Sequence, residues 1–391
     1  MNRETPVEPP LRLALFSGNY NYIMDGPARA LNRLVGYLEA RNIPVLVFAP
    51  TARKAALEHN GTLVSVPSVS IPLRSEYRLG MGLTPHALAE LKAFRPTLFH
   101  LAAPDLLGHS AMRRAKQWKL PVVSSFHTRF DTYARYYRVG VLEKYVTRYL
   151  RNFYNQCDQV YAPSESMAEE LRRELPNADL RIWSRGVDCE RFNPARRDLS
   201  WRRSIGFADE DVVISFAGRL VLEKGLAFFA ETINLLEARG LAHKVLIAGD
   251  GPERSHLQNR LPKAHFTGYL SDAPLARAYA SSDIFFNPSI SESFGNTTLE
   301  AMASGLACVC AQATGSRSLV QDQKTGFLAP GGNHLAFADH LDVLIKSAKL
   351  RHDFGAAAVD VARQFDWDTI LGGLVDNYHD ALASKLVTAP V

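Results

Sequence analysis

With 391 residues, the chain is too long for one typical hydrophobic core, so we expect two domains. Its 47% hydrophobic and 22% charged residues are ordinary globular values and exclude a disordered or collagen-like chain. The formal net charge of +5 is a mild excess, which suits an anionic ligand or an anionic membrane surface and argues against a nucleic-acid-binding protein.

In the first half of the chain, short apolar runs alternate with helical patterns, which is typical of a parallel α/β fold. A loop containing Asp25 and Gly26 precedes a predicted helix over Ala28–Arg41, and Ser166 with Glu169 predicts a capping box for a later helix. The predicted strands are Leu11–Phe16, Val45–Ala49, Leu98–Leu101, Val122–Phe126 and Gln159–Ala162.

The segment Arg185–Pro194 contains turn-forming residues and shows neither helical nor strand periodicity, and we interpret it as a hinge. The sequence therefore predicts an N-terminal domain over 1–190, a C-terminal domain over 191–366 and a terminal segment over 367–391. Beyond the hinge, strands are predicted over Val212–Ala217, Lys244–Ala248, Phe266–Thr267, Ile284–Asn287 and Ala307–Ala311, and helices over Leu226–Arg239, Thr297–Ser304 and Trp367–Ser384. Two such domains predict a ligand in the cleft at the carboxyl ends of both sheets.

Four cysteines are scattered along the chain, and two of them, Cys308 and Cys310, alternate within an apolar run. Because no second Cys or His pair stands at zinc spacing, we predict two packed core thiols and no metal site. Residues 1–10 are polar and proline-rich, unlike a signal peptide, and no apolar run approaches the roughly 18–20 residues of a membrane-spanning helix. We expect a cytoplasmic protein, with peripheral contact to the inner face of the cytoplasmic membrane left open.

The most informative window is Asn287–Gly305. Seven residues separate Glu292 from Glu300, so the two carboxylates cannot be neighbours on one helix face. A strand-to-helix loop explains them better: its last residues would present backbone N–H groups to a diphosphate, Glu292 would accept hydrogen bonds from sugar hydroxyls, and Glu300 from ribose hydroxyls. Two solvated carboxylates near a helix start remain the alternative. The N–H groups in question belong to Phe294, Gly295 and Asn296.

Two further windows carry basic or glycine residues after predicted strands. Arg219 and Lys224 could neutralise a diphosphate leaving group, although surface cations are the common case. Gly251 permits a close backbone approach, or lies in a plain loop.

His127 ends a strand pattern that places it at the cleft, yet a lone histidine is more often structural. The chain contains neither a G-x-G-x-x-G fingerprint after the first strand nor a Walker motif.

Taken together, these windows resemble the retaining glycosyltransferases of family GT4, which have the GT-B fold. The resemblance covers almost the whole chain, and its most specific part is the E-x7-E element from Glu292 to Glu300. It implies two Rossmann-like domains that face each other across a cleft, with a C-terminal helix crossing back to the N-terminal domain. The loop Val66–Pro72 and the phrase Tyr279–Gly305 resemble the lipid-glycosylating branch, which includes sulfoquinovosyldiacylglycerol synthases and phosphatidylinositol mannosyltransferases.

The resemblance implies metal-independent, cofactor-free transfer of a sugar, with retention, from a UDP- or GDP-sugar to a lipid or saccharide hydroxyl. A non-catalytic nucleotide-sugar-binding module is the alternative, but it would predict the loss of Glu292, Arg219 or Lys224, and all three are present. The implied catalytic residues are His127, Arg219, Lys224 and Glu292, and the implied donor-binding residues are Gly26, Gly251, Tyr269, Leu270, Phe294, Gly295, Asn296 and Glu300.

A basic and aromatic stretch over residues 135–151, with further cations at Arg113, Arg114 and Lys116, predicts a second feature. On an amphipathic helix, these side chains could lie against anionic lipid with tyrosines at the interface. A solvated basic face is the alternative.

Overall fold

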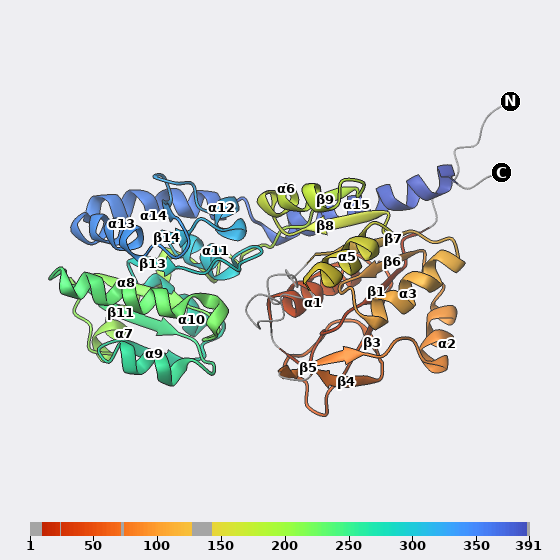
Figure 1. Cartoon of the computed structure of the whole chain (residues 1–391), viewed down its shortest axis with the longest axis horizontal. Coiled ribbons are helices and arrows are strands. Elements are labelled where there is room, and N and C mark those ends of the chain that lie inside the picture. The colour runs from red at the N-terminus through yellow and green to blue at the C-terminus, as the bar shows by residue number, and fades with distance from the viewer. Residues whose placement is uncertain (1–9, 24, 72–73, 127–142, 389–391) are drawn as a thin grey trace. The chain divides into compact units, whose positions relative to one another are not determined.

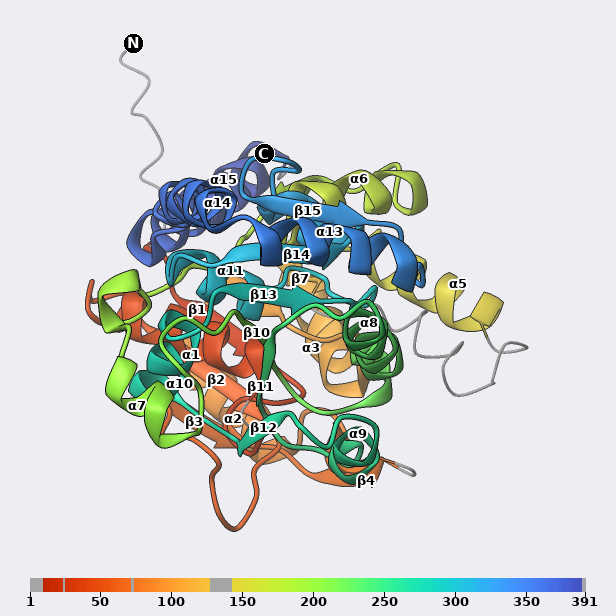
Figure 2. The same cartoon turned by 90° about the vertical axis from the view of Figure 1, so that its left-hand side faces the viewer.

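The computed structural model describes residues 10–23, 25–71, 74–126 and 143–388. They form two compact units: one contains the residues up to Ser184 and from Asp368 onward, and the other contains Arg185–Trp367. In each unit, helices lie on both faces of a parallel sheet (Figures 1 and 2). None of the helices formed by the described residues combines the length and apolar character that a membrane span requires.

The first unit is built on a parallel sheet with strand order β3-β2-β1-β6-β7-β8-β9. These strands are β1 (Leu13–Phe16), β2 (Val45–Ala49), β3 (Thr62–Ser65), β6 (Leu98–Leu101), β7 (Val122–Ser125), β8 (Gln159–Ala162) and β9 (Leu180–Ile182), and a separate antiparallel hairpin pairs β4 (Ser68–Ile71) with β5 (Arg74–Gly80). The helices are α1 (Gly26–Glu39), α2 (Pro85–Phe94), α3 (Leu106–Gln117), α5 (Glu143–Tyr154), α6 (Glu165–Glu174) and α15 (Trp367–Thr388).

Strand alternation divides the core of the first unit between the two faces of its sheet. Phe99 in β6 packs in a cluster with residues of α2, α3, α5 and α6. The next residue, His100, points to the opposite face, where its Nδ1 lies 2.7 Å from the Tyr378 hydroxyl of α15 and its Nε2 lies 2.9 Å from Ser125 Oγ. Lys385 of α15 also bonds Asp158 at 2.8 Å. The C-terminal helix is therefore part of the first unit's core.

The second unit is built on a parallel sheet with strand order β12-β11-β10-β13-β14-β15. Its strands are β10 (Val213–Ala217), β11 (Lys244–Ala248), β12 (His265–Gly268), β13 (Ile284–Asn287), β14 (Ala307–Ala311) and β15 (Gly326–Ala329). Its helices are α7 (Leu199–Ser204), α8 (Leu226–Ala238), α9 (Arg254–Arg260), α10 (Asp272–Ala280), α11 (Asn296–Ala303), α12 (Thr314–Leu319), α13 (His334–Lys346) and α14 (Ala348–Ala362), with 3-10 turns η2 (Pro194–Arg196) and η3 (Leu222–Lys224).

Two local predictions from the sequence have clear outcomes. Cys308 and Cys310 are fully buried side by side in β14, which confirms the core-thiol interpretation. The capping box at Ser166 is wrong, because α6 starts earlier: Ser164 is its N-cap, and its hydroxyl accepts a hydrogen bond from the Met167 backbone N–H. Ser166 lies in the first turn, where its own hydroxyl is 3.4 Å from that of Ser164.

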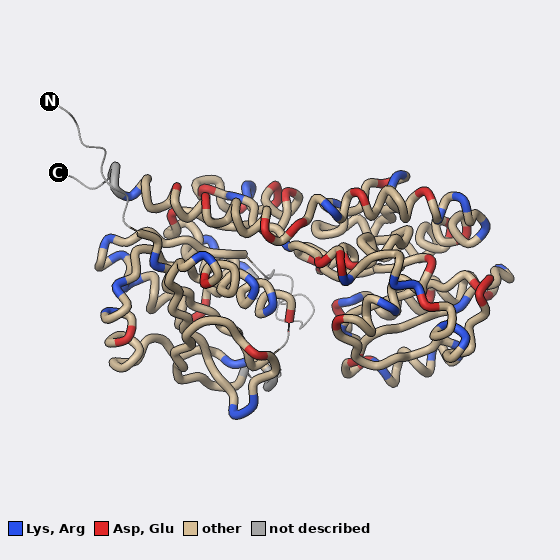
Figure 3. The backbone as a smooth tube through the Cα atoms, turned by 180° about the vertical axis from the view of Figure 1, so that it is seen from behind, with Lys and Arg blue, Asp and Glu red and all other residues tan. Residues whose placement is uncertain are grey.

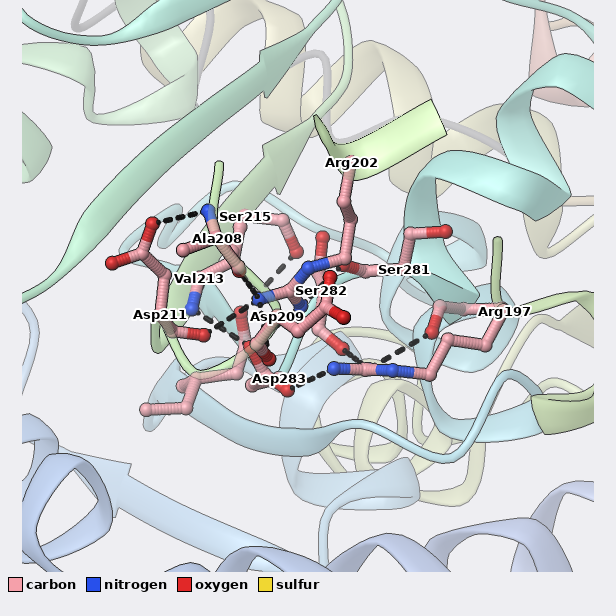
Figure 4. A network of polar contacts seen from close by, with 12 residues as sticks. Arg197, Arg202, Ala208, Asp209, Asp211, Val213, Ser215, Ser281, Ser282 and Asp283 are labelled. Carbon is pink, nitrogen blue, oxygen red and sulfur yellow. Dashed lines mark hydrogen bonds and ion pairs between the residues drawn. The ribbon is translucent and has the colours of Figure 1, made fainter. Parts of the chain in front are cut away.

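A buried arginine fastens α7 to the amino edge of the second sheet (Figure 4). Arg202 is fully buried, and its guanidinium donates to the carbonyl oxygens of Ser281 at 3.0 Å and Asp211 at 2.7 Å. It also bonds the Asp283 carboxylate at 3.2 Å, and the same carboxylate oxygen accepts from the Val213 backbone N–H at 2.8 Å. Because Val213 begins β10 and Asp283 precedes β13, this network sits at the end of the strands opposite to their carboxyl ends.

Candidate functional site

The order of the strands reverses between β10 and β13, two adjacent parallel strands of the second sheet. In open α/β sheets, such a reversal opens a crevice at the carboxyl ends of the strands, where ligands bind. Residues 218–225 follow β10 and residues 288–295 follow β13. The two windows singled out in the sequence therefore form the two loops at this switch point.

An ion pair joins these two loops. Lys224 Nζ lies 2.5 Å from Glu292 Oε1, and the two side chains are 26% and 13% exposed. The hydroxyls of Ser291 and Ser289 both donate to the backbone carbonyl of Glu223, at 2.9 and 3.3 Å. These bonds fix the η3 turn against the second loop, so that a cation and a carboxylate meet at the carboxyl edge of the sheet.

The N-terminus of α11 lies next to this ion pair in the chain. Gly295 occupies the N-cap position with φ of 100°, a backbone conformation that favours glycine, and no side chain caps the helix. The loop before α11 is anchored to α12, because the Gly315 N–H donates to the Glu292 carbonyl at 2.9 Å. Free N–H groups at a helix N-terminus together with the helix dipole favour an anion, so this end of α11 is suited to a phosphate.

Glu300, in the second turn of α11, has a buried partner on α10. The hydroxyl of Tyr279 donates to Glu300 Oε2 at 3.2 Å, and the tyrosine ring is buried. Burial, and then the charge of Glu300, raise the pKa of Tyr279 well above its usual value. The phenol is therefore protonated at all physiological pH values and holds the carboxylate by donating its proton.

Two further loops complete the carboxyl edge. After β11, Gly251 lies so close to the loop after β10 that a Cβ at this position would be 2.3 Å from the Leu220 carbonyl oxygen. After β12, Tyr269 is exposed and Leu270 is partly buried against the core. Arg219 is exposed directly after β10. The loops after β10, β11, β12 and β13 are thus packed into one continuous edge.

The chain matches families of known function over both units. Residues 24–191 match the family model described as Glycosyltransferase Family 4, and residues 211–347 match Glycosyl transferases group 1. The chain is 32% identical to a GDP-mannose-dependent alpha-mannosyltransferase of Mycolicibacterium smegmatis, over 97% of this chain and 100% of that protein. It belongs to glycosyltransferase family 4. It is also 30% identical to the sulfoquinovosyl transferase SQD2 of Arabidopsis thaliana, over 92% of this chain and 71% of that protein.

Solved structures show the fold of this glycosyltransferase. A sucrose-phosphate synthase from Thermosynechococcus elongatus superposes with a TM-score of 0.79 at 17% identity, over 96% of this chain and 100% of that one. Anabaena HepE in complex with UDP-glucose superposes with a TM-score of 0.72 at 16% identity, over 95% and 100% of the two chains. Each of the two units accordingly has the parallel α/β architecture of the GT-B fold.

Most of the residues that the sequence singled out lie on this edge of the second unit. They are Arg219, Lys224, Gly251, Tyr269, Leu270, Glu292, Phe294, Gly295, Asn296 and Glu300. Gly26 lies in the first unit, where it begins α1 beside the N-cap residue Asp25. His127 lies outside the described residues. Among the described residues, no cluster of three or more His, Cys, Asp or Glu is arranged to hold a metal ion.

The sequence did not reveal the residues that hold the site residues in place through hydrogen bonds. Tyr279 stands in an ordinary helical pattern of apolar residues, so nothing marks it as a partner of Glu300. The hydroxyls of Ser289 and Ser291 donate to the backbone carbonyl of Glu223, which lies 66 and 68 positions earlier in the chain. Only the strand order brings these segments together. A polar residue at every second position after β13 is the one local signal that could have indicated the two serines.

Replacing Gly251 by alanine in this glycosyltransferase is expected to destabilise the second unit by about 1–3 kcal/mol, because a backbone carbonyl occupies the space that the new methyl group needs. Thermal unfolding followed by circular dichroism measures the effect. Gly373→Ala is the matched control: this glycine is exposed in α15, nothing lies within 4 Å of its added Cβ, and alanine favours a helix. Equal stabilities of the two variants would contradict the close approach of the loops.

Proposed function

We propose that this protein is a retaining, metal-independent glycosyltransferase that moves a sugar from a nucleoside diphosphate sugar to a hydroxyl group of a membrane lipid. The observation that carries the proposal is the Lys224–Glu292 pair beside the uncapped N-terminus of α11. It combines a cation and free N–H donors for a leaving diphosphate with a carboxylate for the hydroxyls of the transferred sugar.

In the proposed reaction, the bond between the anomeric carbon and the diphosphate oxygen breaks while the acceptor oxygen bonds the same carbon from the same face. The proton of the acceptor hydroxyl goes to the departing phosphate oxygen. Lys224, Arg219 and the N–H groups of Gly295 and Asn296 stabilise the negative charge that grows on the diphosphate, so that no metal ion is required. Glu300 accepts hydrogen bonds from the ribose. The assignment of His127 to the reacting sugar stays a prediction from the resemblance.

The names of the relatives guide the choice of donor and acceptor. Proteins from Corynebacterium glutamicum and Mycolicibacterium smegmatis, 31% and 32% identical to this chain, are named GDP-mannose-dependent alpha-mannosyltransferases. A Streptococcus pneumoniae protein, 26% identical over 84% of this chain, is named alpha-monoglucosyldiacylglycerol synthase. We therefore propose GDP-mannose as the first donor to test, ahead of UDP-sugars, and a glycerolipid hydroxyl as the acceptor class.

A transfer assay tests the proposal directly. Purified protein is incubated with GDP-mannose or UDP-sugars in EDTA, with and without vesicles containing diacylglycerol or glycolipid, and products are identified by mass spectrometry. We expect a glycosylated lipid that retains the donor's anomeric configuration and that is absent with Glu292→Gln. Transfer to soluble saccharides alone would overturn the lipid acceptor, and activity that requires a divalent cation would overturn metal independence.

The Tyr279–Glu300 contact yields a prediction about the nucleotide. Tyr279→Phe is expected to raise the KM for the donor roughly 5- to 10-fold with little change in kcat, because a hydrogen bond to a charged group is lost but the leaving group is untouched. Titration with GDP and with 2′-deoxy- and 3′-deoxy-GDP locates the effect. The variant should discriminate less between ribose and deoxyribose than the unmodified protein, and an equal loss of affinity for all three nucleotides would contradict the assignment.

A further inference from the structure

Four large apolar side chains of the second unit are exposed at its carboxyl edge, which we call the apolar corner. Leu222 of η3 is 71% exposed, Ile290 after β13 is 57%, Leu335 of α13 is 53% and Phe228 of α8 is 38%. Each lies in a segment that follows the carboxyl end of β10, β13 or β15. Single exposed apolar residues are common on protein surfaces, whereas a contiguous group of them marks a binding surface.

Hydrogen bonds join the first two members of the apolar corner. Ile290 stands between Ser289 and Ser291, and both serine hydroxyls donate to the backbone carbonyl of Glu223, at 3.3 and 2.9 Å. Glu223 is the residue directly after Leu222. Ile290 and Leu222 are therefore neighbours in space, although they come from different loops.

Two glycines in the loop after β15 lie against the other members. A Cβ on Gly331 would be 2.4 Å from Ile290 Cγ2, and a Cβ on Gly332 would be 3.6 Å from Phe228 Cζ. Leu335 follows these glycines as the second residue of α13, which shares a hydrophobic core with α8. Because a side chain at position 331 would collide with Ile290 and cover it, glycine there keeps the apolar surface open.

The apolar corner is uncharged, and the acidic residues beside it are paired within the protein. The first acidic residue of α8, Glu231, bonds Arg260 at 3.3 Å, and that of α13, Asp339, bonds Arg239 at 2.8 Å. Charged positions along the backbone are coloured in Figure 3. None of the four side chains of the corner can pair with an anionic headgroup or a charged peptide, so the surface matches an uncharged aliphatic chain.

The apolar corner borders the proposed donor site. Leu222 precedes Lys224 by two positions and Ile290 precedes Glu292 by two, so each lies within roughly 7 Å of a member of the ion pair along the backbone. In a diacylglycerol, the free hydroxyl is only a few bonds away from the esterified acyl chains. A hydroxyl that reaches the anomeric carbon of a bound donor therefore brings the start of these chains to the same edge, where contact with water is unfavourable.

We propose that the apolar corner is the subsite for an acyl chain of the lipid acceptor. Leu222 and Ile290 contact the methylenes next to the glycerol, and Phe228 and Leu335 contact those farther along the chain. Each methylene that leaves water strengthens binding by about fourfold when it is fully buried. The inference rests on the lipid acceptor of the proposed function, and it assigns the recognition of the acyl chain to the unit that also carries the donor site.

The dependence of transfer on acyl-chain length tests the subsite. The full-length protein is assayed with the donor that the transfer assay identifies and with dibutanoyl-, dihexanoyl- and dioctanoylglycerol, each below the concentration at which it aggregates, so that no bilayer takes part. From the butanoyl to the octanoyl acceptor, kcat/KM should rise roughly 10- to 50-fold, because the added methylenes are partly buried. In the double variant Leu222→Gln, Ile290→Gln this rise should shrink to about threefold or less, with the KM for the donor unchanged.

A matched control makes the same kind of change elsewhere on the second unit. Leu199 of α7 and Val343 of α13 are also exposed apolar residues, at 38% and 46%, and Leu199→Gln with Val343→Gln should keep the full dependence on chain length. If the first double variant fails to fold by circular dichroism, Phe228→Gln with Leu335→Gln replaces it, and its loss should be greatest with the octanoyl acceptor.

The possible outcomes separate the subsite from the proposed function. An unchanged dependence on chain length, or an equal loss with all three acceptors, would overturn the subsite and leave lipid glycosylation standing. A dimer in analytical ultracentrifugation that the first double variant abolishes would show that the apolar corner contacts a second copy of the chain. Transfer to soluble saccharides with none to any diacylglycerol would instead overturn the lipid acceptor itself.

Discussion

Replacing Lys224 by methionine is expected to lower kcat for sugar transfer by about 10²- to 10³-fold, the magnitude typical of losing one preorganised charge at a developing anion. Methionine keeps most of the volume of the lysine stem, so the loop should keep its shape through the two serine bonds to the Glu223 carbonyl. The measurement is a steady-state assay with the donor and acceptor found by the transfer experiment. The KM for the donor should rise less than kcat falls, because the charge on the diphosphate is greatest in the transition state.

A matched substitution separates this effect from a loss of net charge. Lys263→Met removes an exposed lysine of the same unit, which contacts only Glu237 among the described carboxylates. We expect its kcat to equal that of the unmodified enzyme. Should Lys224→Met retain kcat within about threefold while folding normally, the ion pair would be structural and the assignment of the leaving-group site to these loops would be wrong.

Replacing Arg202 by methionine is expected to destabilise the second unit by about 3–5 kcal/mol, because it leaves several buried carbonyl groups without their donor and removes one of the two cations that contact the Asp283 carboxylate. For a unit of this size, such a loss lowers the unfolding temperature by roughly 6–20 °C. Differential scanning calorimetry measures it, and the first unit provides an internal reference if its transition is separate.

The neighbouring arginine is the control for that variant. Arg203 is exposed and pairs with Asp209 at the surface, so Arg203→Met should leave the transition close to that of the unmodified protein. Donor binding should survive in Arg202→Met at low temperature, since the network lies at the amino edge of the sheet and the proposed site at the carboxyl edge. Loss of donor affinity without any loss of stability would contradict this separation.

The central strands could be predicted from the sequence because they are buried on both faces. Val45–Ala49 and Ala307–Ala311 are continuous apolar runs, and Gln159–Ala162 is apolar after its first residue. The structure places β2, β14 and β8 over the same residues. Strands β3 and β9 were not predicted. Both lie at sheet edges, are short, and carry exposed or partly exposed residues, so they lack the apolar run that marks a central strand.

For the candidate site, the sequence identified which loops carry suitable groups but not how they meet. Lys224 and Glu292 are 68 positions apart, and their contact depends on β10 and β13 being neighbours in the sheet. The order of the strands depends on how the whole unit packs, and neither loop sequence indicates which strands are neighbours.

The chain leaves the first unit after Ser184 and returns to it at Asp368. This order affects how the protein folds during synthesis on the ribosome. Residues 185–367 are continuous and can fold as soon as they emerge. The first unit must wait for α15, since until then the sheet face carrying His100, Tyr161 and Trp183 has no Tyr378 to cover it. The first unit, although it is synthesised first, therefore completes its fold last, and a chain that ends at residue 367 would present a folded second unit joined to an open, aggregation-prone first sheet.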